Sequence, residues 1–291
     1  MQAFEYVAPT TIKDALELLS DKNLPARSLA GGTDLLVQLR GGKYDLGRVV
    51  DIKAIPELNQ LSFDAREGLT IGAAVPCYQL YGNPIVTSNY PGIKDAASLI
   101  GGTQIQGRAT LGGNLCNSAP SADAIPSLIA SRATCQILTA KGMREVDVED
   151  FCTGPSKNVL ETGELLMSLK IPPPATNTGT HYLRFIPRNE MDIAVVGVGV
   201  SVTLDEDRRR FTAARIGLAS VAPTPLLIGD AEKHLINKEV TDQSISEAAE
   251  IAMEAARPIT DMRGTIEYRR HLVGVLTRRA LKQAIERAME G

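Results

Sequence analysis

The stretch from Ala109 to Pro126 gathers glycines and short polar side chains more densely than any other part of the chain. Its sequence, ATLGGNLCNSAPSADAIP, turns on the pair Gly112-Gly113, and a helical segment is expected after Asp123. Glycines let backbone N–H groups approach a ligand closely, and successive N–H groups in a turn form a concave anion site. The stretch therefore predicts a loop that binds a phosphate-bearing ligand. The alternative is a structural turn whose glycines only supply positive φ angles.

A second glycine pair lies upstream, in the sequence AGGTD at residues 30–34. It joins the end of a predicted strand, 26–29, to the start of a predicted helix through Leu39. Backbone donors and the helix dipole favour an anion at such a place. A carboxylate beside a phosphate is repelled, so we expect Asp34 to cap the helix or to face a ribose hydroxyl. Taken alone, an ordinary strand-to-helix turn explains this glycine pair equally well.

The spacing of the other reactive residues gives no support to metal or nucleophilic chemistry. The cysteines, at positions 77, 116, 135 and 152, form no CxxC pair, whereas zinc and iron–sulfur sites need closely spaced ligands. We expect free buried thiols in a reducing compartment. The histidines, His181, His234 and His271, are scattered, and we interpret each as a surface or structural residue. GVGVSV at 197–202 lacks the third glycine and the following helix of a dinucleotide fingerprint.

The composition is that of an ordinary globular protein. Its 291 residues are 44% hydrophobic and 22% charged, and this length suggests about two domains. The formal charge of −3 argues against nucleic acid or an anionic membrane as the main partner. The first residues, MQAFEYVAPT, do not resemble a signal peptide, and the longest apolar run, 193–202, is too short to span a bilayer. We expect a cytoplasmic protein.

The elements that position the two loops follow from the apolar patterning. Residues 1–54 are predicted to form a small βαβ unit, and a helix at 124–131 is expected to be capped by Asp123. Pro172-Pro173-Pro174 is the predicted domain boundary, because proline cannot pair in a sheet and stiffens an extended linker. The arginine pairs at 269–270 and 278–279 are expected on a solvated helix face, with a subunit contact as the alternative. Beyond the prolines we expect three strands and two helices, at 182–186, 194–203, 213–219, 244–257 and 268–289.

AGGTDLL at 30–36, QIQGRATLGGN at 104–114 and D-A-x-P at 123–126 together resemble the FAD-binding subunit of the molybdenum hydroxylases. This family includes the carbon monoxide dehydrogenase medium chain and the flavin domain of xanthine dehydrogenase. The resemblance favours the phosphate-loop interpretation of both glycine pairs. It continues through later segments in the same order and so covers nearly the whole chain: GELLMSLKIP at 163–172, RFIPRNEMDIAVVGVGV at 184–200 and RGTIEYRRHLVGVLTRRAL at 263–281.

The resemblance implies an α+β fold, in which a PCMH-type FAD-binding domain of two α/β subdomains precedes a C-terminal α/β domain with a three-stranded sheet and helices. The implied FAD-binding domain is 1–175, with subdomains of about 1–54 and 55–175, and the C-terminal domain is 176–291. FAD would lie extended between the subdomains, with Ala30–Asp34 and Thr110–Asn114 contacting its pyrophosphate. Both loops can offer N–H groups to a diphosphate of about two negative charges.

The resemblance also implies contacts outside these loops. Asp123 aligns with an acidic FAD contact, Leu166 with a position that touches the flavin half, and Arg184 with a lysine of some relatives. Two departures affect the flavin surroundings: Gln106-Gly107 stands where many relatives have Arg-Asn, and Ile193 where relatives of the carbon monoxide type often place an aromatic residue. No catalytic residue and no metal ligand is predicted in this chain. The predicted FAD-binding residues are Leu29, Ala30, Gly31, Gly32, Thr33, Asp34, Ile100, Thr110, Leu111, Gly112, Gly113, Asn114, Asp123, Leu166 and Arg184.

By the same resemblance, the substrate is oxidised in a large partner subunit that holds the molybdenum cofactor. Electrons would pass through [2Fe–2S] clusters of a small partner subunit to FAD in this chain and then to an external acceptor. We expect a dimer of heterotrimers, with no nucleic acid and no membrane span. Two alternatives stay open: a stand-alone flavin oxidoreductase of the same fold, such as the enolpyruvyl reductase of cell-wall synthesis, and an assembly module without flavin. Gly112→Val should abolish flavin retention if its loop lies against the pyrophosphate.

Overall fold

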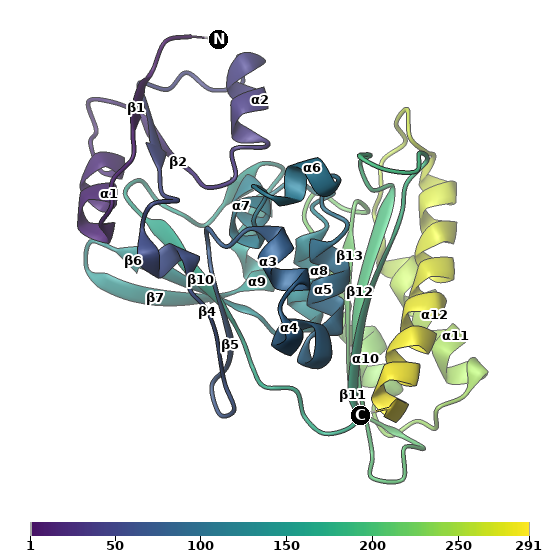
Figure 1. Ribbon diagram of the computed structural model, residues 1–291. Helices are drawn as coiled ribbons and strands as arrows, with labels where there is room; N and C mark the ends of the chain where they lie inside the picture. Colours follow the sequence, from purple (N-terminus) through teal and green to yellow (C-terminus); the bar gives the residue numbers. More distant parts are fainter. Residues whose placement is uncertain (1, 291) are drawn as a thin grey trace.

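The computed structural model describes residues 2–290, in which three larger sheets follow one another along the chain (Figure 1). The first sheet is parallel, with the strand order β1-β3-β2. The predicted βαβ organisation of this region is thereby confirmed. Thr11 caps the first helix by accepting a hydrogen bond from the Asp14 amide at 3.2 Å. The elements are β1 (Glu5–Val7), α1 (Ile12–Leu19), β2 (Ala26–Leu29), α2 (Leu35–Arg40) and β3 (Arg48–Asp51).

The second sheet is antiparallel and has the order β4-β5-β10-β6-β7. Its central strand, β10, comes from much later in the chain than its neighbour β5. The turn that precedes β10 lies beside the first sheet. The strands are β4 (Leu61–Asp64), β5 (Gly68–Gly72), β6 (Thr134–Thr139), β7 (Gly142–Asp147) and β10 (Leu165–Ile171). Before and between these strands lie short elements: η1 (Pro56–Asn59), α3 (Cys77–Tyr81), α4 (Pro84–Asn89), α5 (Pro91–Ala97), α6 (Thr103–Gln106), α7 (Leu111–Asn117), α8 (Ala124–Ala130), α9 (Val148–Phe151), β8 (Cys152–Gly154) and β9 (Lys157–Asn158).

The third sheet carries the C-terminal part of the chain, and α10, α11 and α12 pack with it in one apolar core. Figure 1 shows α12 along one side of this sheet and the α5 and α8 region on the other. Two features were not predicted, a short fourth strand and helix α10. The strands are β11 (Thr178–Phe185), β12 (Val196–Leu204), β13 (Phe211–Ala219) and β14 (Leu226–Leu227). The helices are α10 (Gly229–Leu235), α11 (Asp242–Ala255) and α12 (Ile266–Glu290).

Two glycines that face each other across β12 and β13 let helix α8 pack directly on the third sheet. Gly199 pairs with Gly217 in the strand register. A Cβ at Gly199 would lie 2.4 Å from the carbonyl group of Pro126, and one at Gly217 would lie 2.6 Å from the same oxygen. Side chains cannot occupy this space, since the obstacle on α8 is backbone. Every residue of α8 is buried, so this helix forms the centre of the contact between the two halves of the chain.

The expectation of a solvated face for the arginine pairs was wrong for Arg269, which is buried at the start of α12. Its guanidinium donates to the carbonyls of Val195 at 2.7 Å and Ser220 at 3.1 Å, and it forms an ion pair with Asp261 at 2.7 Å. Buried arginines are tolerated when they are paired in this way. Periodicity placed the residue on the correct helix, but its carbonyl partners come from loops that no local pattern connects to it.

None of the helices formed by residues 2–290 has the length and apolar character of a membrane span. Across the same residues, no three His, Cys, Asp or Glu side chains come together in a way that could hold a metal ion. The predicted boundaries at residues 54 and 175 fall between the strands of successive sheets.

Candidate cofactor site

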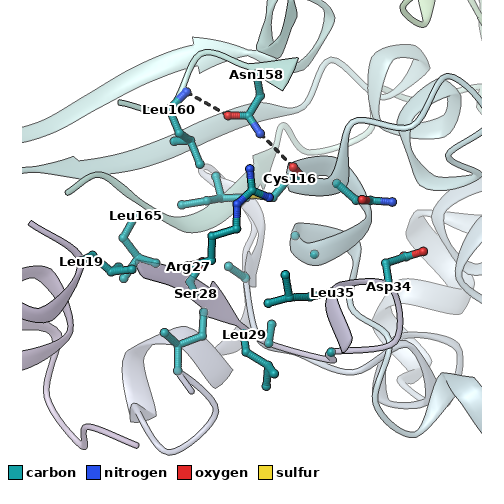
Figure 2. A pocket seen from close by; sticks show the side chains of 18 of the residues that line it. Leu19, Arg27, Ser28, Leu29, Asp34, Leu35, Cys116, Asn158, Leu160 and Leu165 are labelled. Atoms are coloured by element: carbon teal, nitrogen blue, oxygen red, sulfur yellow. Dashed lines mark hydrogen bonds between the residues drawn. The ribbon is translucent and has the colours of Figure 1, made fainter. Parts of the chain in front are cut away.

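A pocket of about 630 Å³ opens where the end of β2, the start of α7 and the turn before β10 meet (Figure 2). The two glycine-pair loops lie on its wall together, although they are far apart in sequence. Of the predicted binding residues, Leu111, Asp123 and Arg184 do not line it. The others do: Leu29, Ala30, Gly31, Gly32, Thr33, Asp34, Ile100, Thr110, Gly112, Gly113, Asn114 and Leu166.

The two loops touch backbone to backbone at Gly31. A Cβ on this residue would lie 2.4 Å from the carbonyl oxygen of Arg108 and 3.0 Å from the Cα of Ala109. The Arg108 side chain reaches back and donates from Nε to the Gly31 carbonyl at 3.0 Å. A second link joins the following helices, because Gln38 on α2 donates to Asn117 on α7 at 2.8 Å. The glycine therefore sets the distance between the loops.

Both loops present amide groups that have no internal acceptor. Within residues 2–290, the N–H groups of Gly31, Gly32, Thr33 and Asp34 donate to no protein atom, and neither do those of Leu111 and Gly112. The next amide, that of Gly113, donates to Thr110 Oγ1 at 2.8 Å and so caps α7. Unpaired amides are costly to bury, and a cluster of them attracts an anion. The wall of the pocket thus carries donors from both loops.

The two glycine pairs are required for more than one reason. Gly32 has a φ of +76°, a left-handed conformation that suits glycine. Gly112 instead lies against the residue that follows β5, since a Cβ there would be 2.7 Å from both the Cα and the carbonyl oxygen of Ala73. A valine at position 112 would therefore disturb the protein even without a ligand. The Gly112→Val substitution cannot decide whether this loop binds a phosphate.

Asp34 stands at the N-cap position of α2, but its side chain makes no capping hydrogen bond. The residue is exposed at the edge of the pocket, yet desolvation of its carboxyl raises its pKa, an effect that Lys43 partly opposes. Of the two roles expected for Asp34, helix capping is thus not seen. Its carboxylate is free to accept a hydrogen bond from a ligand hydroxyl.

The predicted cap of α8 was wrong, because Asn114 takes that role in place of Asp123. Asn114 Oδ1 accepts from the Ala124 amide at 3.1 Å. The Asp123 carboxylate is buried and accepts from the Tyr182 hydroxyl and from Arg184, each at 2.7 Å. Burial raises the pKa of Asp123, and its two partners act in the opposite direction. Asp123 and Arg184 thus form an internal ion pair between α8 and β11, next to the pocket wall but not on it.

Gln106, the last residue of α6, is uncharged where many relatives carry an arginine, and its amide has internal partners. Its side chain is buried, and Nε2 donates to the carbonyls of Ser98 at 2.8 Å and Ile100 at 3.3 Å. The amide therefore holds the 98–102 turn, which brings Ile100 to the pocket. Close by, Met191 packs on this turn, because a Cβ at Gly102 would lie 2.9 Å from its Cγ. Ile193, the second departure, is exposed.

Asn158 and Arg27 are two of the pocket side chains that sequence reasoning missed. Asn158, at the end of β9, donates to the Cys116 carbonyl at 2.8 Å and accepts from the Leu160 amide at 3.1 Å, as Figure 2 shows. It thereby fastens the turn before β10 to α7. Arg27 extends from β2 into the pocket. No motif marks Asn158, whereas the position of Arg27, three residues before the AGGTD turn, could have drawn attention to it.

Comparison with known proteins identifies the class. The family model "FAD binding domain in molybdopterin dehydrogenase" matches residues 2–174, and the model "CO dehydrogenase flavoprotein C-terminal domain" matches residues 181–284. The chain therefore belongs to the FAD-binding medium-subunit family of the molybdenum hydroxylases, which are oxidoreductases. The resemblance inferred from the sequence motifs is confirmed.

Particular relatives match over almost the whole length. The putative xanthine dehydrogenase FAD-binding subunit of Escherichia coli is 33% identical over 284 residues, which is 97% of this chain and 96% of the relative. The carbon monoxide dehydrogenase medium chain of Afipia carboxidovorans is 32% identical and covers 98% of each. Among solved structures, a chain of the carbon monoxide dehydrogenase of Hydrogenophaga pseudoflava superposes with a TM-score of 0.93 at 30% identity, over 98% of both chains.

The residues of the pocket fit the FAD that the family implies. Its volume of about 630 Å³ lies in the range of about 300–1,000 Å³ that cofactor sites occupy. The amide donors of the two loops suit the two negative charges of a diphosphate, and Leu29, Ile100 and Leu166 add apolar surface. A pocket with few anchoring groups and an apolar wall is what a dinucleotide needs.

Proposed function

We propose that this chain is the flavoprotein subunit of a molybdenum hydroxylase and relays electrons from the [2Fe–2S] clusters of a small partner subunit to an external acceptor. The molybdenum cofactor would lie in a large partner subunit, in a cytoplasmic dimer of heterotrimers. The observation that carries the proposal is the convergence of two loops, 30–34 and 110–114, whose unpaired amides line one pocket. Membership of the family supports the assignment of FAD to that pocket.

In this proposal, the protein contributes binding and orientation, and no side chain of this chain takes part as an acid or base. The amides of Gly31 and Gly112 hold the diphosphate from opposite loops, and Asp34 accepts a hydrogen bond from a ribose hydroxyl. Bound FAD supplies a redox group that can exchange electrons singly or in pairs. Ile100 and Leu166 exclude water from the apolar wall of the pocket. A stable flavin site needs such an apolar wall in addition to the polar groups that anchor the diphosphate.

Asp123 and Arg184 are proposed as further contacts of the cofactor, with the Asp123 carboxylate facing a hydroxyl of FAD. Their ion pair is internal, so one carboxylate oxygen is already engaged by Arg184 and the other by Tyr182. We infer that they fix the connection between α8 and β11 at the edge of the site. Any contact with FAD would use the remaining lone pairs and donors of this pair.

The proposal is tested first with the chain alone. The apo-protein, titrated with FAD, should quench the flavin fluorescence with a stoichiometry near one. Thr33→Glu, which adds a carboxylate to the amide loop, should weaken FAD binding at least about tenfold, because a like charge a few Å from the diphosphate costs more than about 1.4 kcal/mol. Thr10→Glu is the matched control, because Thr10 is exposed and does not line the pocket. Equal affinities for the two variants would place the site elsewhere.

The relay is tested in the native complex. Purified with its partner chains, the protein should carry molybdenum, iron and FAD, and the flavin absorbance should bleach when the organic substrate of the complex is added. The isolated chain should oxidise no organic substrate. Turnover by the isolated chain would favour the stand-alone oxidoreductase, and a chain that cannot be loaded with FAD would favour the assembly module.

A further inference from the structure

Two cations, Lys22 and Arg27, line the described wall of the pocket. Arg27 is the one guanidinium among its residues, and its charge has no counter-ion there. It stands on β2, just before the AGGTD turn. Figure 2 shows its side chain extending from the strand across the pocket toward Cys116 on α7. The electrostatic effect of Arg27 on Cys116, whose pKa it lowers against the larger effect of burial, agrees with this closeness. The cation therefore lies between the two structural units that build the pocket.

Two of the four carboxylates on the described wall of the pocket pair with other cations. Asp21 pairs with Arg48 at 3.4 Å, and Glu164 pairs with Arg144 at 2.6 Å. Desolvation raises the pKa of the Asp34 carboxyl, and the positive charge that partly opposes this rise is that of Lys43, not that of Arg27. Over residues 2–290, neither a hydrogen bond nor an ion pair is found for the Arg27 guanidinium.

What holds Arg27 in place is an aromatic ring. Its Cζ lies 3.9 Å from the centroid of the Tyr44 ring, and Tyr44 does not itself line the pocket. Such a cation–π contact uses the face of the guanidinium and leaves the N–H groups at its edge free. A long side chain that is already ordered loses less entropy when it binds a ligand. The geometry is that of a donor group prepared for an anion.

We infer that Arg27 is the side-chain ligand of the cofactor's diphosphate, an inference that rests on the proposed function. Two loops of neutral amides reduce the repulsion of two phosphate charges only in part, and the carboxylate of Asp34 at the same loop increases it. The planar fork of an arginine can bind two phosphate oxygens at once and supplies a full positive charge. Arg27 thus completes the pyrophosphate site with the charge that the backbone lacks.

The experiment uses the full chain without cofactor and three variants. Arg27→Gln removes the charge, Arg27→Lys keeps it without the fork, and Arg40→Gln is the control. Arg40 is exposed on α2 and does not line the pocket. Affinities for FAD, ADP and adenosine are measured by fluorescence or calorimetry at two salt concentrations, with melting curves of the apo-proteins as a check on folding.

A hydrogen bond to a charged group contributes about 1.5–3 kcal/mol, so Arg27→Gln should weaken FAD and ADP about 10- to 150-fold. Arg27→Lys should recover part of the loss, and adenosine binding should be unchanged, because adenosine carries no phosphate. The dependence of ADP affinity on salt should also become less steep in Arg27→Gln. Arg27→Lys keeps a cation for the Tyr44 ring and should melt close to Arg40→Gln, whereas Arg27→Gln loses this cation–π contact and should melt slightly lower.

Three results would overturn the inference, and they can be distinguished. If the unaltered chain binds neither FAD nor ADP, the proposed function fails and the inference fails with it. If that chain binds FAD but Arg27→Gln matches Arg40→Gln, the function stands and the role of Arg27 is refuted. An equal loss of ADP and adenosine would assign Arg27 to the nucleoside, by stacking, and not to the diphosphate.

Discussion

Replacing Gly31 with alanine tests the contact that sets the distance between the two loops. The new methyl group would lie 2.4 Å from the Arg108 carbonyl oxygen and 2.9 Å from its carbonyl carbon. Both atoms are backbone, so no side-chain rotation relieves the clash, and the loops must separate. Overpacking of this kind costs about 1–3 kcal/mol. For a protein of this size we expect the melting temperature of the apo-protein to fall by roughly 2–4 °C per kcal/mol.

The same separation moves the amides of Gly31 and of Gly112 away from a common ligand. If it weakens one charge-assisted hydrogen bond, FAD affinity falls by about tenfold or more. Gly107→Ala is the matched control, in the facing segment next to Arg108. Its ideal Cβ has no neighbour within 4 Å, and its φ of −66° is open to alanine. Alanine there should be neutral or stabilise by up to about 1 kcal/mol.

The two variants are compared by thermal melting without FAD and by fluorescence titration with it. Gly31→Ala should be worse than Gly107→Ala in both measurements. If the two variants melt together and bind FAD equally, the loops do not depend on this contact, and the proposed origin of the pocket is refuted. A loss of stability with unchanged affinity would refute only the coupling between loop distance and ligand binding.

Two further predictions concern charge. Burial alone would raise the pKa of Asp95, but hydrogen bonds from His181 and Arg287 outweigh it and lower the pKa. The stability from this network is therefore present above the unfolded pKa of about 4 and is lost as the pH falls through the lower folded value. Arg287→Gln should reduce the acid dependence of the urea midpoint between pH 3 and 7; parallel curves for both proteins would contradict this. Burial raises the pKa of Cys116 to about 12, so the native thiol should resist Ellman's reagent at pH 8 and react only after unfolding, whereas rapid labelling of the native chain would be incompatible with that environment.

The sequence predicts those parts of the fold in which local pattern and local chemistry agree. The alternation of strand and helix in the first 54 residues, and the turn after Leu29, are read from apolar spacing and from AGGTD. Strand β14 and helix α10 are not predicted from the sequence. Their two and seven residues carry too little periodicity to be detected.

The candidate site is predicted where a loop acts through its own backbone, and missed where it depends on a distant partner. Position alone makes Asp123 a reasonable cap of α8, yet the fold brings Asn114 to that helix end and turns Asp123 toward β11. Gly112 looks like a ligand contact, although its close neighbour is Ala73. Asn158 makes its hydrogen bond 42 residues away in sequence, and such a pairing is set by the packing of whole sheets.

The glycine pair Gly199 and Gly217 limits how these two halves could be exchanged between proteins. Asn114 lines the pocket and caps α8, and the backbone of α8 at Pro126 occupies the space above the two glycines. The geometry of the pocket is therefore transmitted from a sheet that contributes none of its wall. In a chimera, a C-terminal half taken from another member of the family would fit this FAD-binding half only if it also left both positions without side chains. The two halves are consequently a matched set rather than interchangeable modules.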